Sequence, residues 1–139
     1  MDQTEIISFL QTSLGGVDTV TDDGNYFFFY DPQKTLPVDH RFPFVTLTTS
    51  DKYDQFSNLN RDGIYRLNIG LKKETFKSLF PIEPEHVNYA AIDQLMPHPV
   101  YGKMYWVCVL NPRDATFEKV RPLLAEAYNQ AKARIDRKG

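Results

Sequence analysis

The spacing of apolar side chains divides the sequence into a helical start, a middle rich in strands and a helical end. Near the N-terminus apolar residues recur at the three- and four-residue spacing of an amphipathic helix, which Gly15 and Gly16 end. The spacing then changes to two, which is typical of strands with one buried face. The pattern predicts helices over residues 2–14, 71–80 and 111–135 and strands over 17–21, 25–30, 44–49, 64–69 and 105–110.

This order of elements, α-β-β-β-β-α-β-α, predicts an α+β fold. Successive strands with helices before, among and after them favour a two-layer domain, with a mainly antiparallel sheet of about five strands and helices on one face. A Rossmann fold is disfavoured because no glycine-rich phosphate loop follows any predicted strand. Residues 1–139 are expected to form a single domain, since this length suits one hydrophobic core.

The strand over 64–69 carries the clearest alternation. Tyr65, Leu67 and Ile69 point to one face, while Arg66 and Asn68 point to the other. One sheet face is therefore expected to be the main core. The other face is expected to be partly wet, because it bears a cation and an amide.

The strand over 105–110 is the most apolar and is expected to be central, with Trp106 as a core anchor. Asn111 is a plausible N-cap for the last helix, with Pro112 at its first position. Pro122 lies within the helical pattern, which predicts either one bent helix or a short turn over 115–121 followed by a longer helix. The loop over 81–100 has room for a helical turn around residues 90–95.

The run NYFFFY over residues 25–30 places aromatic side chains on both faces of its strand. Either Phe27 and Phe29 pack under the helices, or Tyr26, Phe28 and Tyr30 do, and the pattern does not decide between these two arrangements. Three short helices cover only one face of the sheet, so loops or a second subunit must cover the other. We expect a homodimer or, failing that, another protein partner, with the interface at Tyr26, Phe28 and Tyr30.

The net charge and the cysteine content indicate which partners and which cellular compartment to expect. The net charge of −2 provides no basic field, which makes nucleic acid an unfavoured partner. No signal peptide or apolar stretch of membrane-spanning length is visible, so a cytoplasmic protein without a membrane partner is expected. The single Cys108 lies in the apolar run WVCVL, which indicates a buried structural thiol in a reducing compartment.

No motif of high chemical specificity occurs, so the sequence does not state an activity. His40, His86 and His98 show no metal-ligand spacing, and we predict no metal, no cofactor and no catalytic residue. A triple of Ser50, His98 and Asp93 lacks a nucleophile elbow. The interpretation leans away from an enzyme.

The strongest candidate for a ligand site combines polar residues of the second sheet face with residues of two proline-bounded loops. In the alternative that we favour, Arg66 pairs with an acid such as Asp93 or Asp31 and pins a loop over the sheet. Basic and aromatic residues also interleave around Tyr53, but neighbouring acidic residues argue against single-stranded nucleic acid. The candidate ligand-binding residues are Arg66, Asn68, His98, Tyr101, His40 and Arg41.

The runs HRFPFVTLTTSDKYD, GIYRLNIG, AIDQLMPHPVY, WVCVLNP and RPLLAEAY together resemble a bacterial domain family of unknown function, over nearly the whole chain. More distantly, Trp106 at a strand and Tyr128 in the final helix are similar to the pattern of YjbR-like proteins, a group sometimes labelled DNA-binding. That similarity implies an α-β(3)-α-β(2)-α fold shared with secretion chaperones, and it implies no chemistry. The Asn-Lys-x-His-Trp run of YjbR-like proteins is absent, so its role does not transfer.

Taken together, these patterns favour a non-catalytic module that binds a protein partner or itself. The alternative is a small-molecule-binding protein, or an undetected enzyme, with a pocket near Arg66, Asn68 and His98. Nucleic-acid binding comes third.

Overall fold

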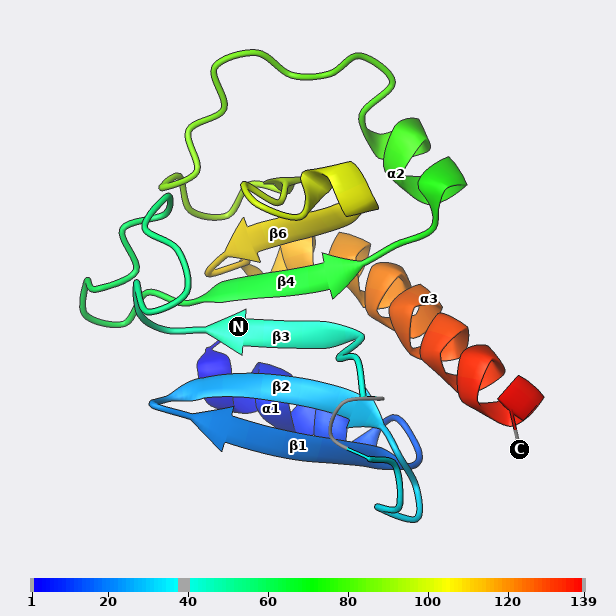
Figure 1. Ribbon diagram of the computed structural model, residues 1–139. Coiled ribbons are helices and arrows are strands. Elements are labelled where there is room, and N and C mark those ends of the chain that lie inside the picture. Colours follow the sequence, from blue (N-terminus) through cyan, green and yellow to red (C-terminus); the bar gives the residue numbers. More distant parts are fainter. Residues whose placement is uncertain (1, 38–40, 139) are drawn as a thin grey trace.

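The computed structural model describes residues 2–37 and 41–138, and the described chain forms a sheet with helices packed on one face (Figure 1). The sheet has the strand order β1-β2-β3-β4-β6-β5, and every neighbouring pair is antiparallel. The elements are α1 (Gln3–Thr12), β1 (Val17–Asp22), β2 (Asn25–Tyr30), β3 (Val45–Thr48), β4 (Arg66–Gly70), α2 (Lys73–Leu79), β5 (Met96–Pro97), the 3-10 turn η2 (Gly102–Met104), β6 (Trp106–Leu110) and α3 (Asp114–Lys138).

The α+β prediction is confirmed, with six strands in place of about five. The additional strand, β5, has two residues and pairs with β6. So short an element leaves no alternation in the sequence, because period two needs several residues to be recognised. The prediction that β6 is central is only partly right, since β6 is second from the edge and has the short β5 outside it.

The register of the strands produces one continuous apolar surface. Tyr26, Leu47, Leu67 and Val109 lie opposite one another across β2, β3, β4 and β6. A second row of apolar residues on the same face begins at Phe28 and continues across the strands through Val45, Ile69 and Val107. Helices α1 and α3 cover these rows, so we call this side of the sheet the helix face.

Helices α1 and α3 pack against the sheet through apolar side chains that recur at helical spacing. Helix α1 begins with a capping box in which Asp2 and Glu5 each accept a hydrogen bond from the other's backbone N–H, and it buries Ile6 and Leu10. Helix α3 presents an apolar stripe at helical spacing to the sheet. The buried residues of that stripe are Phe117, Val120, Leu124, Ala127 and Ala131.

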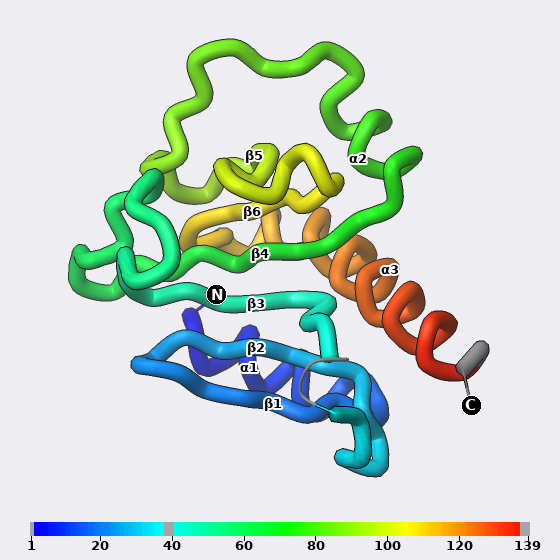
Figure 2. The backbone as a smooth tube through the Cα atoms, viewed as in Figure 1, coloured from blue at the N-terminus to red at the C-terminus, as the bar shows by residue number. Residues whose placement is uncertain are grey.

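The beginning of α3 and the loop before β5 differ from the prediction. Helix α3 continues through Pro122 without a break, since the apolar stripe on both sides of the proline packs against one sheet face. It begins at Asp114 rather than at Pro112. Asn111 takes a positive φ of 41° and connects two backbones instead, because its side chain accepts from Tyr65 N and donates to Gly63 O. No helical turn forms over residues 90–95, and Figure 2 shows the connection from α2 to β5 arching beyond the sheet edge.

The run NYFFFY now has an assigned orientation. Phe28 is 0% exposed in the main core, and Tyr26 and Tyr30 pack beside it on the helix face. Phe28 is therefore closed to a partner in the folded chain, whereas Tyr26 and Tyr30 are half-buried and stay a predicted interface. Phe27 and Phe29 point to the opposite side, which we call the loop face because loops rather than helices cover it.

The alternation in β4 is confirmed, and the expected wetness of its second face is wrong. Leu67 and Ile69 are in the main core, whereas Arg66 and Asn68 lie on the loop face. Both polar side chains are nonetheless buried, because residues of the 49–63 loop and His98 close over them. The loop face thus contains a polar interior of its own.

Candidate functional site

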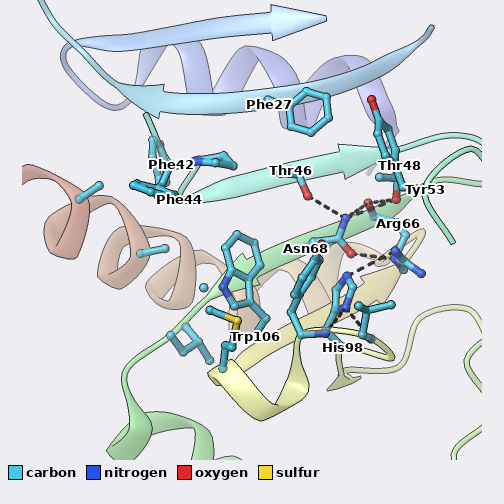
Figure 3. A pocket seen from close by; sticks show the side chains of 18 of the residues that line it. Phe27, Phe42, Phe44, Thr46, Thr48, Tyr53, Arg66, Asn68, His98 and Trp106 are labelled. Carbon is cyan, nitrogen blue, oxygen red and sulfur yellow. Dashed lines mark hydrogen bonds between the residues drawn. The ribbon is translucent and has the colours of Figure 1, made fainter. Parts of the chain in front are cut away.

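A cavity of about 530 Å³ lies on the loop face of the sheet. It extends from the polar residues of β3 and β4 to the end of β4, where the C-terminal half of α3 closes it (Figure 3). Its volume is within the range of small-molecule sites. The lining residues divide into a polar floor at Thr46, Thr48, Asp54, Arg66, Asn68 and His98, and a largely apolar remainder at Phe27, Phe42, Pro43, Phe44, Tyr53, Gly70, Leu71, Val100, Tyr101, Met104, Trp106, Ala127 and Ala131. Two further polar residues of α3, Gln130 and Arg134, line the cavity at its far end from the floor.

Arg66 is the centre of the polar floor. Its side chain is 1% exposed, and its guanidinium forms a paired contact with Asp54, from Nη1 to Oδ1 at 3.0 Å and from Nη2 to Oδ2 at 2.6 Å. Nε donates to Asn68 Oδ1 at 2.7 Å, and Nη1 also donates to Ser57 Oγ at 2.9 Å. A planar guanidinium suits such a paired carboxylate contact, which fixes its orientation.

The identity of this acid corrects the sequence interpretation. Arg66 does hold a loop over the sheet, as the structural alternative expected, but its partner is Asp54. Asp93 instead accepts a hydrogen bond from the backbone N–H of Arg113 at 2.7 Å. Asp31 accepts from the backbone of its own loop at Thr35. The pinned segment is the 49–63 loop.

Asn68 connects the floor to β3. Its Nδ2 donates to Thr46 Oγ1 at 3.0 Å and to Thr48 Oγ1 at 3.3 Å. The cause is the register, since Thr46 is directly opposite Asn68 and Thr48 is directly opposite Arg66 in the antiparallel pair. The floor is consequently held by two central strands, which makes its geometry rigid.

His98 completes the floor from the segment between β5 and η2. Its Nδ1 accepts hydrogen bonds from the backbone N–H groups of Val100 and Tyr101, each at 3.0 Å. An acceptor Nδ1 carries no proton, so the neutral ring carries its proton on Nε2. Nε2 lies 3.4 Å from Arg66 Nη2. Burial and then the nearby Arg66 charge lower the pKa of His98 to about 3, so the ring is neutral at physiological pH.

The Asp54 carboxylate is ionised. Burial opposes its charge, yet the hydrogen bonds and the charge of Arg66 outweigh burial and hold the pKa of Asp54 below its usual range. One cation, one anion and one neutral imidazole therefore make up the titratable groups of the floor. Their summed charge is zero.

Aromatic rings form the walls above this floor. Tyr101 lies 5.1 Å from His98 and 6.4 Å from Trp106, measured between ring centroids, and Phe27 meets Tyr53 edge-on at 5.7 Å. Trp106 lies directly across from Gly70 in the β4–β6 pair. A Cβ at Gly70 would come within 2.9 Å of Trp106 Cε2, so glycine is required for the indole to approach the β4 backbone this closely.

The structure brings together four of the predicted ligand residues, Arg66, Asn68, His98 and Tyr101. Arg41 lies apart from them. It donates to Asp18 Oδ2 at 2.7 Å, and its guanidinium stacks 4.1 Å from the centroid of the Phe29 ring, so it covers the second ring of NYFFFY that points to the loop face. His40 lies outside the described residues.

Three residues of the floor, Thr46, Thr48 and Asp54, were missed in the sequence, and so was Ser57, which supports the floor through its bond with Arg66. Thr46 and Thr48 had a usable signal, because they alternate with Val45 and Leu47 in a strand that was correctly predicted. Asp54 and Ser57 had no comparable signal. Each is one polar residue among many in a loop, and only the tertiary structure brings it to Arg66.

Other chemistry in the described chain is limited. Cys108 is buried beside the cavity floor, and burial raises the pKa of its thiol to about 12. Within residues 2–37 and 41–138, no three His, Cys, Asp or Glu side chains are grouped closely enough to hold a metal ion. Over the same residues, no helix has the length and apolar character needed to span a bilayer.

The buried His98 should make the protein less stable in mild acid. Its folded pKa of about 3 lies below the ordinary value of 6.5, so the unfolded chain takes up a proton first. The free energy of unfolding is therefore highest above pH 6.5 and decreases as the pH falls from there toward 3. The decrease is about 2 kcal/mol by pH 5. Urea unfolding at pH 7 and pH 5 measures this change.

The matched control is His98→Gln, whose side-chain oxygen can accept the same backbone hydrogen bonds without titrating. The pKa of Asp54 lies below 3.8, so this carboxylate contributes little between pH 7 and pH 5. The difference between the two proteins therefore isolates the imidazole. Equal pH slopes for wild type and variant would contradict the buried, neutral state of His98.

The comparisons with known proteins identify a family. The model of a family of unknown function, DUF6194, matches residues 1–139. Neither the curated proteins nor the solved structures contain a match to this chain. The resemblance to a domain family of unknown function is thereby confirmed, and the family match covers the whole chain. The chain belongs to the DUF6194 family.

Proposed function

We propose that this protein binds a small organic molecule in the cavity on the loop face. The observation that carries the proposal is the combination of a 530 Å³ cavity with a buried polar floor and aromatic walls. Binding sites for small molecules are mostly apolar hollows with a few well-placed polar groups. The proposal adopts the alternative that the sequence patterns ranked second.

The rigidity of the floor supports this proposal. The guanidinium of Arg66 donates four hydrogen bonds, to Asp54, Asn68 and Ser57. Asn68 in turn donates two to the threonines of β3. Polar groups held in this way do not need to be ordered when a ligand arrives, which reduces the entropic cost of binding. A network that served only to pin the loop would not require an adjoining cavity.

Trp106 provides a direct test, because it is the single tryptophan of the chain and lines the cavity. Titration with a library of aromatic fragments should change its fluorescence. The same fragments should shift the backbone amide signals of Thr46, Asn68 and Trp106 in ¹H–¹⁵N spectra and leave those of β1 unchanged.

A matched pair of variants controls for binding elsewhere. Thr46→Phe places a ring inside the cavity and should abolish the response, whereas Thr21→Phe, on the edge strand β1, should preserve it. Melting curves confirm that both variants are folded. Fragments that shift only amides outside the cavity, or that bind Thr46→Phe as well as wild type, would overturn the proposal.

A second copy of the chain across the mouth of the cavity is the second candidate. Phe42 and Met104 are 66% and 65% exposed at the mouth, and Tyr53, Val100 and Tyr101 are exposed beside them. A patch of this kind is typical of a contact surface. Two-fold self-association is the commonest way to bury such a patch, and this patch lies on the opposite sheet face from the interface first expected at Tyr26, Phe28 and Tyr30.

This candidate predicts a mass near twice that of one chain in light scattering. Phe42→Glu and Met104→Glu should shift the mass toward the monomer, because each puts a charge into the patch. Ile82→Glu is the control, since Ile82 is 84% exposed outside the cavity lining. A wild-type mass equal to one chain at high protein concentration would rule out the dimer.

Nucleic-acid binding has weaker support. Lys52 contacts the carboxylates of both Asp22 and Asp23 at 2.8 Å, and Arg66 is neutralised by Asp54, so these two cations near the aromatic residues are already paired with acids. The distant similarity to YjbR-like proteins adds no ligand to the proposal. The described chain also has four strands before α2, where that similarity implied three.

A further inference from the structure

Two buried N–H groups meet at the floor of the cavity without an acceptor between them. His98 Nε2 carries the proton of the neutral ring, because Nδ1 is occupied by two backbone N–H groups. It faces Arg66 Nη2 at 3.4 Å, and a guanidinium nitrogen can only donate. His98 Nε2 and Arg66 Nη2 are therefore not hydrogen-bonded to each other. Both donate into the same region of the floor.

Arg66 has one N–H left for this region. Four of its five donors are used by Asn68, Ser57 and the two oxygens of Asp54. The second proton on Nη2 remains, next to His98, which is 5% exposed. The hydroxyl of Thr46 accepts from Asn68 and has its own proton to give on the same floor.

Buried donors of this kind require an acceptor, since an unsatisfied one costs about 1–3 kcal/mol. We propose that the ligand supplies it as an uncharged oxygen, the carbonyl of a planar amide or ring ketone, which takes hydrogen bonds from His98 and Arg66 while the ligand's flat body lies between the aromatic walls. This inference rests on the proposed function and specifies its ligand class.

The charge balance of the floor favours a neutral acceptor. A carboxylate or phosphate oxygen bound to Arg66 Nη2 would share that nitrogen with Asp54 Oδ2, which is already 2.6 Å away. Two anions at such separation repel strongly in a buried site. A cationic head group would meet the proton-bearing sides of Arg66 and His98. An uncharged carbonyl accepts both hydrogen bonds and avoids either repulsion.

The walls favour a planar body. Trp106 lies on one side of the floor, and Phe27 and Tyr53 come from β2 and the 49–63 loop (Figure 3). The ring of Tyr101 packs beside that of Trp106. Flat rings gain stacking and edge contacts with such side chains in addition to simple burial. The end of the cavity at α3 combines Ala127 and Ala131 with the polar side chains of Gln130 and Arg134, so it has room for a substituent that need not be apolar.

Four probes that share a phenyl ring and differ in the head group test the inference: benzamide, benzoate, benzylammonium and toluene. Trp106 fluorescence and amide shifts report occupancy of the cavity. Benzamide should bind about tenfold or more tightly than each of the other three, the size of effect that losing one or two buried hydrogen bonds produces. The side-chain Nε2–H signal of His98 should move with benzamide and stay in place with toluene.

Each contrary result has a distinct meaning. Benzoate or benzylammonium binding as well as benzamide would overturn the neutral head group, and toluene binding as well would overturn the role of the donors. In these cases the cavity still binds small molecules, so the proposed function stands. No response of any cavity residue to these probes or to the fragment library would overturn both.

Two variants examine the donors individually. Thr46→Val keeps the shape of the side chain and removes its hydroxyl, and His98→Phe keeps a ring and removes Nε2–H. Each should reduce the preference for benzamide over toluene, whereas a purely structural role would change the affinity for both probes alike. Should His98→Phe fail to fold, Thr46→Val and the wild-type probe series remain decisive. A wild-type preference of unity, or a preference left unchanged in every variant that folds, would overturn the inference.

Discussion

Replacing Asp54 by Ala should lower the free energy of unfolding by about 3–5 kcal/mol, the range seen when one member of a buried ion pair is removed. The reason is the burial of Arg66, which is 1% exposed and would keep its charge without the carboxylate. Urea denaturation measures the change. Hydrogen exchange should also quicken in the 49–63 loop, since Asp54 is one of the two side chains by which Arg66 holds that loop.

The double variant Asp54→Leu/Arg66→Met provides the control. It removes both charges and replaces them with apolar side chains, so it should be more stable than Asp54→Ala despite carrying one more substitution. A loss below about 1 kcal/mol for Asp54→Ala, the size of an exposed ion pair, would contradict the burial of this network. Such a result would also weaken the case for a rigid floor.

Two adjacent rings of NYFFFY should respond very differently to truncation. Phe28→Ala should cost about 3–5 kcal/mol, because Phe28 is 0% exposed and its removal leaves a cavity between the sheet and the helices. Phe27→Ala should cost about 1–2 kcal/mol, since Phe27 is half-buried beside an existing cavity and contacts Tyr53.

Urea midpoints of the two variants, compared with the wild type, check this prediction. Both residues are phenylalanines at adjacent positions of the same strand, so the main difference between them is the sheet face to which each ring points. Equal losses for Phe27→Ala and Phe28→Ala would contradict the assignment of Phe28 to the helix face. The Phe27 variant should in addition alter fragment binding, whereas the Phe28 variant should act on stability alone.

Much of the fold was predictable because it depends on local alternation. Leu67 and Ile69 were correctly separated from Arg66 and Asn68, since successive residues of a strand must point to opposite faces. The capping box at Asp2 and Glu5 was also recognisable, as its partners are three residues apart. The same local logic failed at Asn111, where tertiary hydrogen bonds to the start of β4 replaced the expected helix cap.

The candidate site was predictable only in its strand residues. Arg66 and Asn68 were identified because a cation and an amide stood out in an apolar strand, and His98 and Tyr101 followed from their position in a proline-bounded loop. Asp54 was not identified as the partner of Arg66. Several acidic residues lie in loops that could bring them to Arg66, and nothing in the local sequence pattern distinguishes Asp54 from Asp93 as its partner.

By itself, the sequence determined which side chains share a face, because that property depends on the pleat of a strand and the turn of a helix. The tertiary structure alone decided which face of NYFFFY lies under the helices, which acid neutralises Arg66 and where the cavity remains. These outcomes depend on strand register and on loops that return from 12 to 32 residues away, as in the contacts of Arg66 with Asp54 and His98. Such contacts form only when the whole chain has packed, so no short stretch of sequence encodes them.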